Sequence, residues 1–382
     1  MKIGLLGHGV VGGGVTSITD SCAARKVRRL EVTRILVKDA TEMTDPRCTL
    51  NPEDILADPD IEVIAECMGG LEPAHTYVSR ALEAGKHVVT SNKKMFAAYC
   101  RELFDLAREN GVTIRFEASC GGGIPWIHAI TRTRRLEKVN SFRGIFNGTT
   151  NYILSRMAET QADFAQCLKE AQKLGYAEKN PTEDINGLDT RFKSAITSLK
   201  AFDAMIDSDA IPTYGISGIT LQDLSWAKEN GCTIKLMAGG KDEGETVNLW
   251  VMPVILPNTD FFTTIPMNYN AMESNSDTLG KAAYVGQGAG ALPTAHAVVQ
   301  DLLDIYQSED TAVPAPQEKA VNNDSLKAQF YVRAENIEPF HTVCKEKTAD
   351  NAVITKEISF SEIDQLLKEQ KGNAAFVAMV QK

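Results

Sequence analysis

Two short stretches of the chain carry residues whose types and spacing could do chemistry. Residues 7–12 read GHGVVG, a G-x-G-x-x-G spacing that directly follows an apolar run. Between a strand and a helix, such a loop turns tightly and brings backbone N–H groups to a diphosphate. Asp189 and Lys193 are four positions apart in GLDTRFK and share one face of a predicted helix. The first stretch predicts dinucleotide binding, and the second supplies either a surface ion pair or a proton donor beside a carboxylate.

The elements that must position the glycine loop alternate regularly over the first 130 residues. Apolar runs predict strands at 2–6, 32–37, 63–67, 87–90 and 113–117. Amphipathic stretches predict helices at 10–24, 73–84 and 96–110. This order is typical of βαβ units around a parallel sheet. We therefore predict an α/β fold with an N-terminal Rossmann-type, doubly wound parallel sheet.

The regular alternation of strands and helices ends at about residue 138. Strands are predicted at 140–146 and 246–256, and helices at 151–157, 163–174, 187–202, 221–230 and 293–306. We expect a dinucleotide-binding domain at 1–137 completed by helix 293–306, and an α+β substrate-binding and dimerisation domain at 138–292. A linker at 307–323, rich in Pro, Asn, Ala and charge, then leads to a small domain at 324–382.

The composition excludes several classes of protein. The 382 residues carry 50 acidic and 40 basic side chains, a net charge of −10 that does not suit a nucleic-acid partner. No apolar run has the length of a membrane span, and no signal-peptide pattern is present, so we expect a cytoplasmic protein. Eight cysteines without a C-x-x-C pair indicate reduced thiols, and six histidines without ligand spacing argue against a transition-metal site.

Several longer segments resemble homoserine dehydrogenases. They are GLLGHGVVG from Gly4, TSNKKMFA from Thr90, FEASCGGGIP from Phe116, FNGTTNYIL from Phe146, LGYAEKNPTEDINGLDTRFK from Leu174 and GQGAGALPTAHAVVQD from Gly286. The resemblance runs in order through residues 1–306. It implies an NAD- or NADP-dependent oxidoreductase that interconverts L-aspartate 4-semialdehyde and L-homoserine, in the biosynthesis of threonine, methionine and isoleucine.

The resemblance assigns the proton chemistry to lysines. Lys193 matches the general acid/base, Asp189 matches a substrate contact, and Lys93 matches a second cation that reaches the pocket. An ordinary lysine pKa of about 10.4 is too high for proton exchange near neutrality, and burial or a neighbouring cation lowers it. We expect Lys94 to face solvent, although an alignment shifted by one residue would exchange it with Lys93.

The resemblance also implies two sets of binding residues. Those for the substrate are Thr149, Gly175, Tyr176, Glu178, Asp184, Asp189 and Lys193. Those for the cofactor are Gly7, Gly9, Val10, Val11, Gly12, Lys38, Gly69, Asn92, Lys93 and Gly288. Carboxylates suit the substrate's ammonium group, although Glu178 and Asp184 could equally be ordinary charges flanking helices. Lys38 favours a 2′-phosphate and the adjacent Asp39 favours a free ribose, so NADP and NAD both remain open.

The segment FEASCGGGIP supports more than one interpretation. The resemblance implies a sodium ion held by the Glu117 carboxylate and the carbonyl groups of Cys120, Gly122 and Ile124, and hard oxygen ligands suit such an ion. Alternatively, the glycine turn only joins two domains. A rival enzyme class starts from the Cys120 thiolate, as in an acylating aldehyde dehydrogenase. A further rival is a nucleotide-binding regulatory protein without catalysis.

The chain continues for about seventy residues past the part that resembles the catalytic core. In the family such a tail is commonly an ACT domain that binds an amino-acid effector. This tail begins with QFYVR at Gln329 but has ENIEPF at Glu335 where an acidic-Pro-Gly turn is usual. We therefore expect an ACT-like or truncated domain, with doubtful feedback by threonine. The resemblance also implies a homodimer or homotetramer.

Overall fold

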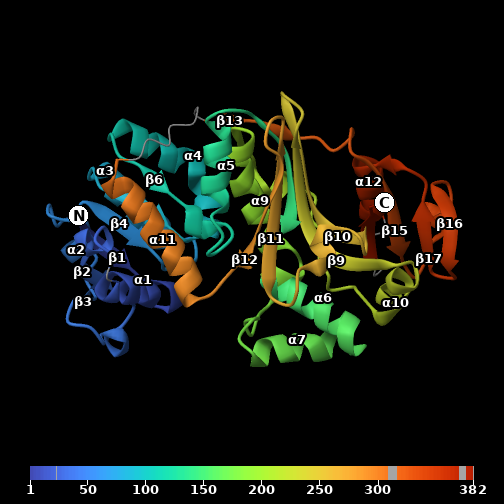
Figure 1. Ribbon diagram of the computed structural model, residues 1–382, viewed down its shortest axis with the longest axis horizontal. Helices are drawn as coiled ribbons and strands as arrows, with labels where there is room; N and C mark the ends of the chain where they lie inside the picture. The colour runs from blue at the N-terminus through green and yellow to red at the C-terminus, as the bar shows by residue number, and fades with distance from the viewer. Residues whose placement is uncertain (23, 309–315, 370–375, 382) are drawn as a thin grey trace. The chain divides into compact units, whose positions relative to one another are not determined.

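The computed structural model describes residues 1–22, 24–308, 316–369 and 376–381 of the chain (Figure 1). They form two compact units. The first comprises Met1–Arg135 and Gly286–Ala315, and the second comprises Leu136–Val285 and Pro316–Lys382. None of the described helices has both the length and the apolar character needed to cross a membrane.

The first unit is built on a six-stranded sheet in the order β3-β2-β1-β4-β5-β6. Its strands are β1 (Lys2–Leu6), β2 (Glu31–Leu36), β3 (Cys48–Thr49), β4 (Val63–Glu66), β5 (His87–Thr90) and β6 (Ile114–Arg115). Every neighbouring pair is parallel. The predicted Rossmann-type sheet is confirmed.

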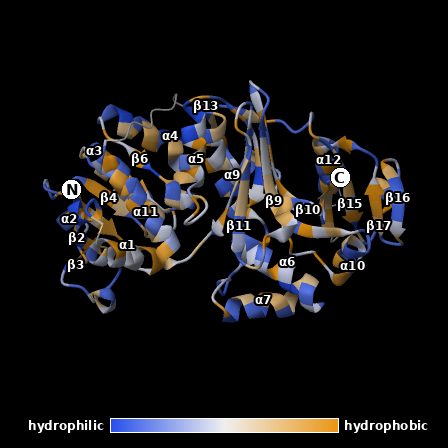
Figure 2. Ribbon diagram, viewed as in Figure 1, coloured by the Kyte–Doolittle hydropathy of each residue, from blue (hydrophilic) through white to orange (hydrophobic). Residues whose placement is uncertain are grey.

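Helices complete the first unit around this sheet. They are α1 (Val10–Ser21), α2 (Glu53–Leu56), α3 (Ala74–Glu83), α4 (Lys93–Glu109), α5 (Trp126–Arg134) and α11 (Ala291–Tyr306). The returning helix α11 shares one core with β1 and α1, since Val298 and Leu302 are buried together with Leu5. Gly14 permits the close approach of α1, because a Cβ there would lie 2.7 Å from the Ala291 carbonyl oxygen. Apolar residues follow β1 and β4 in Figure 2.

The second unit is built on a mixed eleven-stranded sheet. Its main path is β12-β11-β7-β9-β10-β19-β15-β17-β16, with β14 paired to β10 and β18 to β15. The strands are β7 (Val139–Ile145), β9 (Cys232–Asp242), β10 (Thr246–Pro257), β11 (Tyr269–Ser276), β12 (Gly280–Gln287), β14 (Ala320–Val321), β15 (Lys327–Arg333), β16 (Cys344–Ala349), β17 (Ala352–Thr355), β18 (Ile358–Ser359) and β19 (Phe376–Val380). A separate pair joins β8 (Ala204–Met205) to β13 (Gln317–Glu318).

Six helices pack in the second unit. They are α6 (Gly148–Thr160), α7 (Phe164–Lys173), α8 (Thr182–Ile185), α9 (Leu188–Ala201), α10 (Leu221–Glu229) and α12 (Phe360–Glu369). Helix α7 combines polar and apolar sides, as its mixed colours in Figure 2 show. Short 3-10 segments in the two units are Val27–Arg29, Ala40–Glu42, Glu117–Ser119, Ser208–Ala210, Phe261–Thr264 and Glu338–Phe340.

The C-terminal segment continues the sheet of the second unit instead of standing apart. β19 pairs in parallel with β10 through Val254 and Met379. Phe330 and Val332 of β15 lie in the same hydrophobic cluster as Met252 of β10. The linker expected at 307–323 contains β13 and β14, and its residues 309–315 lie outside the described part of the chain. The expected boundary at 323/324 therefore falls inside one packed unit.

Candidate active site

The glycine loop lies between β1 and α1. Gly7 has a φ of +92°, and a Cβ there would lie 2.9 Å from the Cys67 carbonyl oxygen. A Cβ on Gly12 would lie only 2.0 Å from the Gly7 carbonyl oxygen, so the turn and the helix are in close contact there. A Cβ on Gly9 would meet nothing within 4 Å. The loop therefore has a tight turn, a tightly packed helix and open space at its middle glycine, which is the arrangement that admits a diphosphate.

Polar residues at the ends of β4 and β5 hold the neighbouring loops. The buried Glu66 carboxylate accepts hydrogen bonds from the Met68 N–H at 2.8 Å and the Thr90 hydroxyl at 2.6 Å. Burial raises the pKa of Glu66. Asn92 caps α4 by accepting from the Met95 N–H at 3.2 Å, and its amide donates to the Gly70 carbonyl at 2.7 Å. These bonds hold the loop at residues 68–70, which directly follows β4.

The remaining cofactor candidates lie around the same sheet. Val10 is 71% exposed at the start of α1, next to half-buried Val11, and Gly69 has a φ of +76° with open space around it. The backbone of Gly288 packs against the glycine turn, since a Cβ on Gly122 would lie 2.5 Å from its carbonyl carbon. These positions belong to the first unit.

Lys38 and Asp39, which lie just beyond the end of β2, make different contacts. The Asp39 carboxylate accepts a hydrogen bond from the Thr41 N–H at 2.9 Å and caps a 3-10 turn. Its bonds with Thr41 lower the pKa of Asp39. Lys38 has an exposed side chain. Both side chains are exposed, but Asp39 Oδ1 is held by Thr41, so one carboxylate oxygen is occupied at the position where an acidic residue contacts the ribose in dinucleotide folds.

Lys93 and Lys94 both lie in the first turn of α4, and both are half-buried. Lys94 is therefore less exposed than the sequence suggested. Burial alone does not decide between the two lysines.

The Glu117 carboxylate is only 2% exposed and lies at the N-terminus of α5. Its oxygens accept from the Ile127 N–H at 3.0 Å and the His128 N–H at 2.6 Å. Burial raises the pKa of Glu117 to about 8. The His128 Nδ1 atom lies 3.1 Å away, so three of roughly four lone-pair sites on this carboxylate are in use. One remains for a cation.

A glycine turn follows Glu117. Gly121 and Gly122 have positive φ values of +93° and +58°. The Ile124 carbonyl already accepts from the Trp126 N–H at 2.7 Å. Cys120 is completely buried, which leaves its thiol no access to a substrate carbonyl. The donor set is one of hard oxygens and fits a monovalent cation better than covalent thiol chemistry.

The second unit contains a buried pair of opposite charges. Gly187, with a φ of +82°, precedes α9, and Asp189 and Lys193 follow on one face of that helix. Lys193 Nζ lies 2.8 Å from Asp189 Oδ2, and their side chains are 10% and 6% exposed. The same ammonium group donates to the Phe146 carbonyl oxygen at 2.8 Å. The pair is therefore a buried, oriented proton-carrying group and not a solvated surface ion pair.

Asn147 joins the carboxylates of this cluster. Its side-chain amide donates to Asp184 Oδ1 at 2.7 Å and to Asp189 Oδ2 at 2.9 Å. Its carbonyl oxygen accepts from the Thr150 N–H at 2.8 Å and so caps α6. Sequence reasoning missed Asn147, although it lies inside the FNGTTN segment that carried the resemblance.

Asn270 supports the carbonyl group that binds the lysine. This fully buried side chain of β11 donates from Nδ2 to the Phe146 carbonyl oxygen at 2.9 Å. Its own Oδ1 atom is buried without a hydrogen-bond partner among the described residues. Nothing in the local sequence, MNYNAM, distinguishes Asn270 from an ordinary strand residue.

The loop before α8 contributes the remaining substrate candidates. The Thr149 hydroxyl donates to the Tyr176 carbonyl, and Gly175 adopts a φ of +77° at the preceding turn. Tyr176 is 39% exposed, with its ring 5.0 Å from that of Tyr152. Glu178 is exposed, and its carbonyl accepts from the Gln172 side chain at 3.0 Å.

The described contacts thus bring Asp184, Asp189 and Lys193 together, with Thr149 tied to the neighbouring loop. No described contact joins Glu178 to them. An ammonium group held between a carboxylate and a carbonyl can give and take a proton, and adjacent acids can bind a second cation.

Comparisons with known proteins agree with this chemistry. A family model for homoserine dehydrogenase matches residues 125–303, and a model for the homoserine dehydrogenase NAD-binding domain matches residues 7–117. The homoserine dehydrogenase of Neisseria gonorrhoeae is 36% identical over 356 residues, which cover 88% of this chain and 82% of that protein. That of Bacillus subtilis is 36% identical over 81% of this chain and 73% of its own length.

Solved structures show the same likeness over the whole chain. The crystal structure of a homoserine dehydrogenase from Thiobacillus denitrificans is similar with a TM-score of 0.89 and 31% identity, covering 100% of this chain and 98% of that one. A hyperthermophilic archaeal homoserine dehydrogenase in complex with NADPH has a TM-score of 0.68 at 22% identity over 81% of this chain and 98% of that one, which shows the fold alone. The chain belongs to the homoserine dehydrogenase family, whose members are oxidoreductases.

Proposed function

We propose that Lys193 is the general acid/base with which this homoserine dehydrogenase interconverts L-aspartate 4-semialdehyde and L-homoserine. A bound nicotinamide cofactor supplies or accepts the hydride. Lys193 gives a proton from Nζ to the oxygen that becomes the alcohol, and takes it back in the reverse direction. The observation that carries this proposal is the buried Lys193–Asp189 pair, with 2.8 Å between Nζ and Oδ2. Lys93 is proposed to add a second positive charge near the reacting oxygen.

The amino and carboxylate groups of the substrate are proposed to bind to acidic side chains and backbone groups around α8 and α9. Asp184 and Asp189 supply negative charge for its ammonium group, and Asn147 holds both carboxylates in place. Thr149, Gly175, Tyr176 and Glu178 are proposed to line the same pocket. Glu178 is exposed, so its contribution requires the substrate to lie over the Gly175 turn.

The decisive test of this function is an absorbance assay of the reduced nicotinamide. Homoserine with NAD or NADP should generate reduced cofactor, and the Cys120→Ser variant should retain turnover. No turnover with either cofactor would favour the regulatory alternative. Loss of all turnover in a folded Cys120→Ser protein would favour the acylating alternative.

For the cofactor we propose NADP, bound at Gly7, Gly9, Val10, Val11, Gly12, Gly69, Asn92, Lys93 and Gly288, with Lys38 at the 2′-phosphate. The support is the exposed Lys38 side chain, beside an Asp39 carboxylate whose Oδ1 atom is occupied by Thr41.

Substitution of Lys38 by Glu should change the cofactor preference. We expect the KM for NADPH to rise about 10- to 100-fold, the equivalent of one lost charge-assisted hydrogen bond, and the KM for NADH to change little. Steady-state kinetics with both cofactors measure the two values. Lys26→Glu, at another exposed lysine of the first unit, is the matched control. An equal rise for both cofactors would exclude a 2′-phosphate contact.

Asn270→Leu tests the support of the lysine. Leucine has a similar shape but cannot donate to the Phe146 carbonyl, so the carbonyl and the Lys193 ammonium lose their fixed position. We expect kcat to fall roughly tenfold with an almost unchanged KM, because the effect is on alignment. Stability should change little, since the unpartnered Oδ1 atom is removed as well. Asn275→Leu on the same strand is the control, and equal kcat values for the two variants would contradict the positioning role.

Three further assignments follow from the family. We propose sodium at Glu117, Cys120, Gly122 and Ile124, where it would hold the glycine turn, and the remaining lone pair on Glu117 supports this. We propose an ACT-like, truncated role for the C-terminal segment, without threonine control. A homodimer through the sheet of the second unit is proposed as the assembly. Threonine titration of the activity checks the second assignment, and clear inhibition would overturn it.

A further inference from the structure

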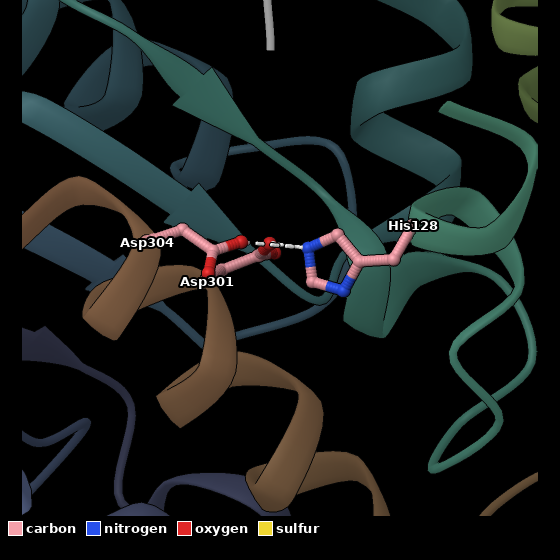
Figure 3. A group of neighbouring side chains, drawn as sticks. All are labelled: His128, Asp301 and Asp304. Carbon is pink, nitrogen blue, oxygen red and sulfur yellow. Dashed lines mark ion pairs between the residues drawn. The ribbon is translucent and has the colours of Figure 1, made fainter. Parts of the chain in front are cut away.

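One cluster of ionisable side chains in the first unit takes no part in the proposed reaction. His128 of α5 faces Asp301 and Asp304 of α11, and Figure 3 shows the ends of both carboxylates gathered at one side of the imidazole ring. We propose that this cluster binds one divalent transition-metal ion, with His128 Nε2 and one oxygen from each aspartate as ligands. The sequence argued against a transition-metal site because the histidines show no ligand spacing, and these donors come from two helices far apart along the chain.

The donor atoms lie close enough together for one ion. His128 Nε2 lies 2.8 Å from Asp304 Oδ2 and 3.3 Å from Asp301 Oδ1. All three ligand atoms lie within 4.8 Å of one another. Bonds of about 2.1 Å from one metal ion place neighbouring donors about 3.0–3.4 Å apart. The two measured nitrogen–oxygen separations are close to that range.

The orientation of His128 also differs from that of a hydrogen-bonded ion pair. Its Nε2 atom is buried and has no hydrogen-bond partner of normal alignment, although two carboxylate oxygens are so near. His75, also between two carboxylates, makes an aligned bond from each ring nitrogen, to Glu72 at 3.1 Å and to Glu102 at 3.0 Å. Two ligand atoms of one metal ion point at the ion and not at each other. Carboxylate oxygens that lie near His128 Nε2 without an aligned hydrogen bond are therefore the arrangement expected of metal ligands.

Neighbouring groups hold these ligands in place. Glu117 Oε2 lies 3.1 Å from His128 Nδ1, which puts the ring proton there and leaves the Nε2 lone pair for a metal. The other Asp301 oxygen accepts from the Glu117 N–H at 2.9 Å. Histidine ligands in metal sites commonly have such a carboxylate behind them.

The charges of the cluster also suit a divalent ion. Three carboxylates, of Glu117, Asp301 and Asp304, meet the guanidinium of Arg115, which lies 3.0 Å from Asp304 Oδ2. A divalent ion that replaces the Nε2 proton of His128 adds one positive charge to a group that has more carboxylates than cations. An imidazole with carboxylates suits Zn²⁺, Mn²⁺ or Co²⁺.

Titration with Co²⁺ tests the site in the full chain after removal of metals with a chelator. We expect one Co²⁺ per chain, with a visible d–d band and no thiolate charge-transfer band, since no cysteine is a ligand. His128→Asn and Asp304→Asn should each weaken binding by at least about tenfold. His75→Asn is the matched control and should bind as the wild type does.

Thermal unfolding gives a second readout that needs no catalysis. Co²⁺ should raise the Tm of the wild type and of His75→Asn but not that of Asp304→Asn. Circular dichroism checks that each variant is folded, and Asp304→Asn carries the test if His128→Asn does not fold. The proposal is overturned if the wild type does not bind Co²⁺, if the variants bind it as tightly as the wild type, or if a thiolate band accompanies binding.

Discussion

Substitution of Lys193 by Met should lower kcat by about 10²- to 10⁴-fold, the usual contribution of one general acid/base. Methionine keeps the length and much of the packing of the lysine stem but has no proton to give. The Asp189 carboxylate loses its buried counter-charge, which costs stability, but its hydrogen bond from Asn147 at 2.9 Å keeps it in place. The loss should therefore be in the chemical step, with a much smaller change in the KM for homoserine.

A control on the same helix makes this result specific. Lys200→Met, in the last turn of α9, removes an equal charge outside the proposed site and should leave kcat within a factor of two or so of wild type. Steady-state rates in both directions, with circular dichroism to check folding, measure the effect. If Lys193→Met keeps wild-type kcat, the proton comes from another group and the proposed mechanism fails.

The N-terminal sheet could be predicted closely because each of its signals is local. Strands β1, β4 and β5 are short apolar runs, and the helices between them have clear amphipathic periods. Parallel sheets buried on both faces have this continuous apolar pattern, and the order of the elements then sets the topology. The confirmed Rossmann-type sheet follows from that consistency.

In the second unit the strands predicted at 140–146 and 246–256 are present as β7 and β10, whereas the long strand β9 between them was missed for a physical reason. β9 contains Gly239 and Gly240, which weaken a strand pattern. A Cβ on Gly239 would lie 2.4 Å from the Trp250 ring, and one on Gly240 would lie 2.6 Å from the Phe142 ring. These glycines make room for aromatic side chains of the neighbouring strands. That requirement is tertiary, and a single sequence does not contain it.

In the candidate site too, local features could be predicted from the sequence and tertiary contacts could not. The i, i+4 spacing of Asp189 and Lys193 could be read from the sequence, but that they are buried together could not. Asn147 and Asn270 act through hydrogen bonds to groups distant in sequence: Asn147 donates to Asp184 and Asp189, and Asn270 donates to the Phe146 carbonyl. Asparagine is common in turns and strand ends, so its residue type alone did not mark either of them.

The C-terminal segment gives the second large expected effect, and it is on stability. Phe330→Ala should lower the free energy of unfolding of the second unit by about 3–5 kcal/mol, the usual cost of deleting a fully buried phenylalanine side chain. Phe330 is 0% exposed, and its ring lies 5.9 Å from that of Phe360 in an edge-to-face contact. It belongs to one core with Trp250 and Met252 of β10, so the cavity that the substitution creates would lie in the core of the second unit, which also holds the proposed Lys193 site.

Urea unfolding followed by tryptophan fluorescence measures this effect in a background that carries Trp126→Phe and Trp226→Phe, because the remaining Trp250 is 6% exposed within the same core. Leu174→Ala, at a side chain that is 53% exposed, is the control and should change stability by no more than about 0.5 kcal/mol. A C-terminal domain that folded by itself would unfold in a transition of its own, and Phe330→Ala would then shift that transition while the Trp250 signal and the activity stayed constant. A shared core requires the opposite: the Trp250 transition moves to lower urea, and activity is lost along the same curve.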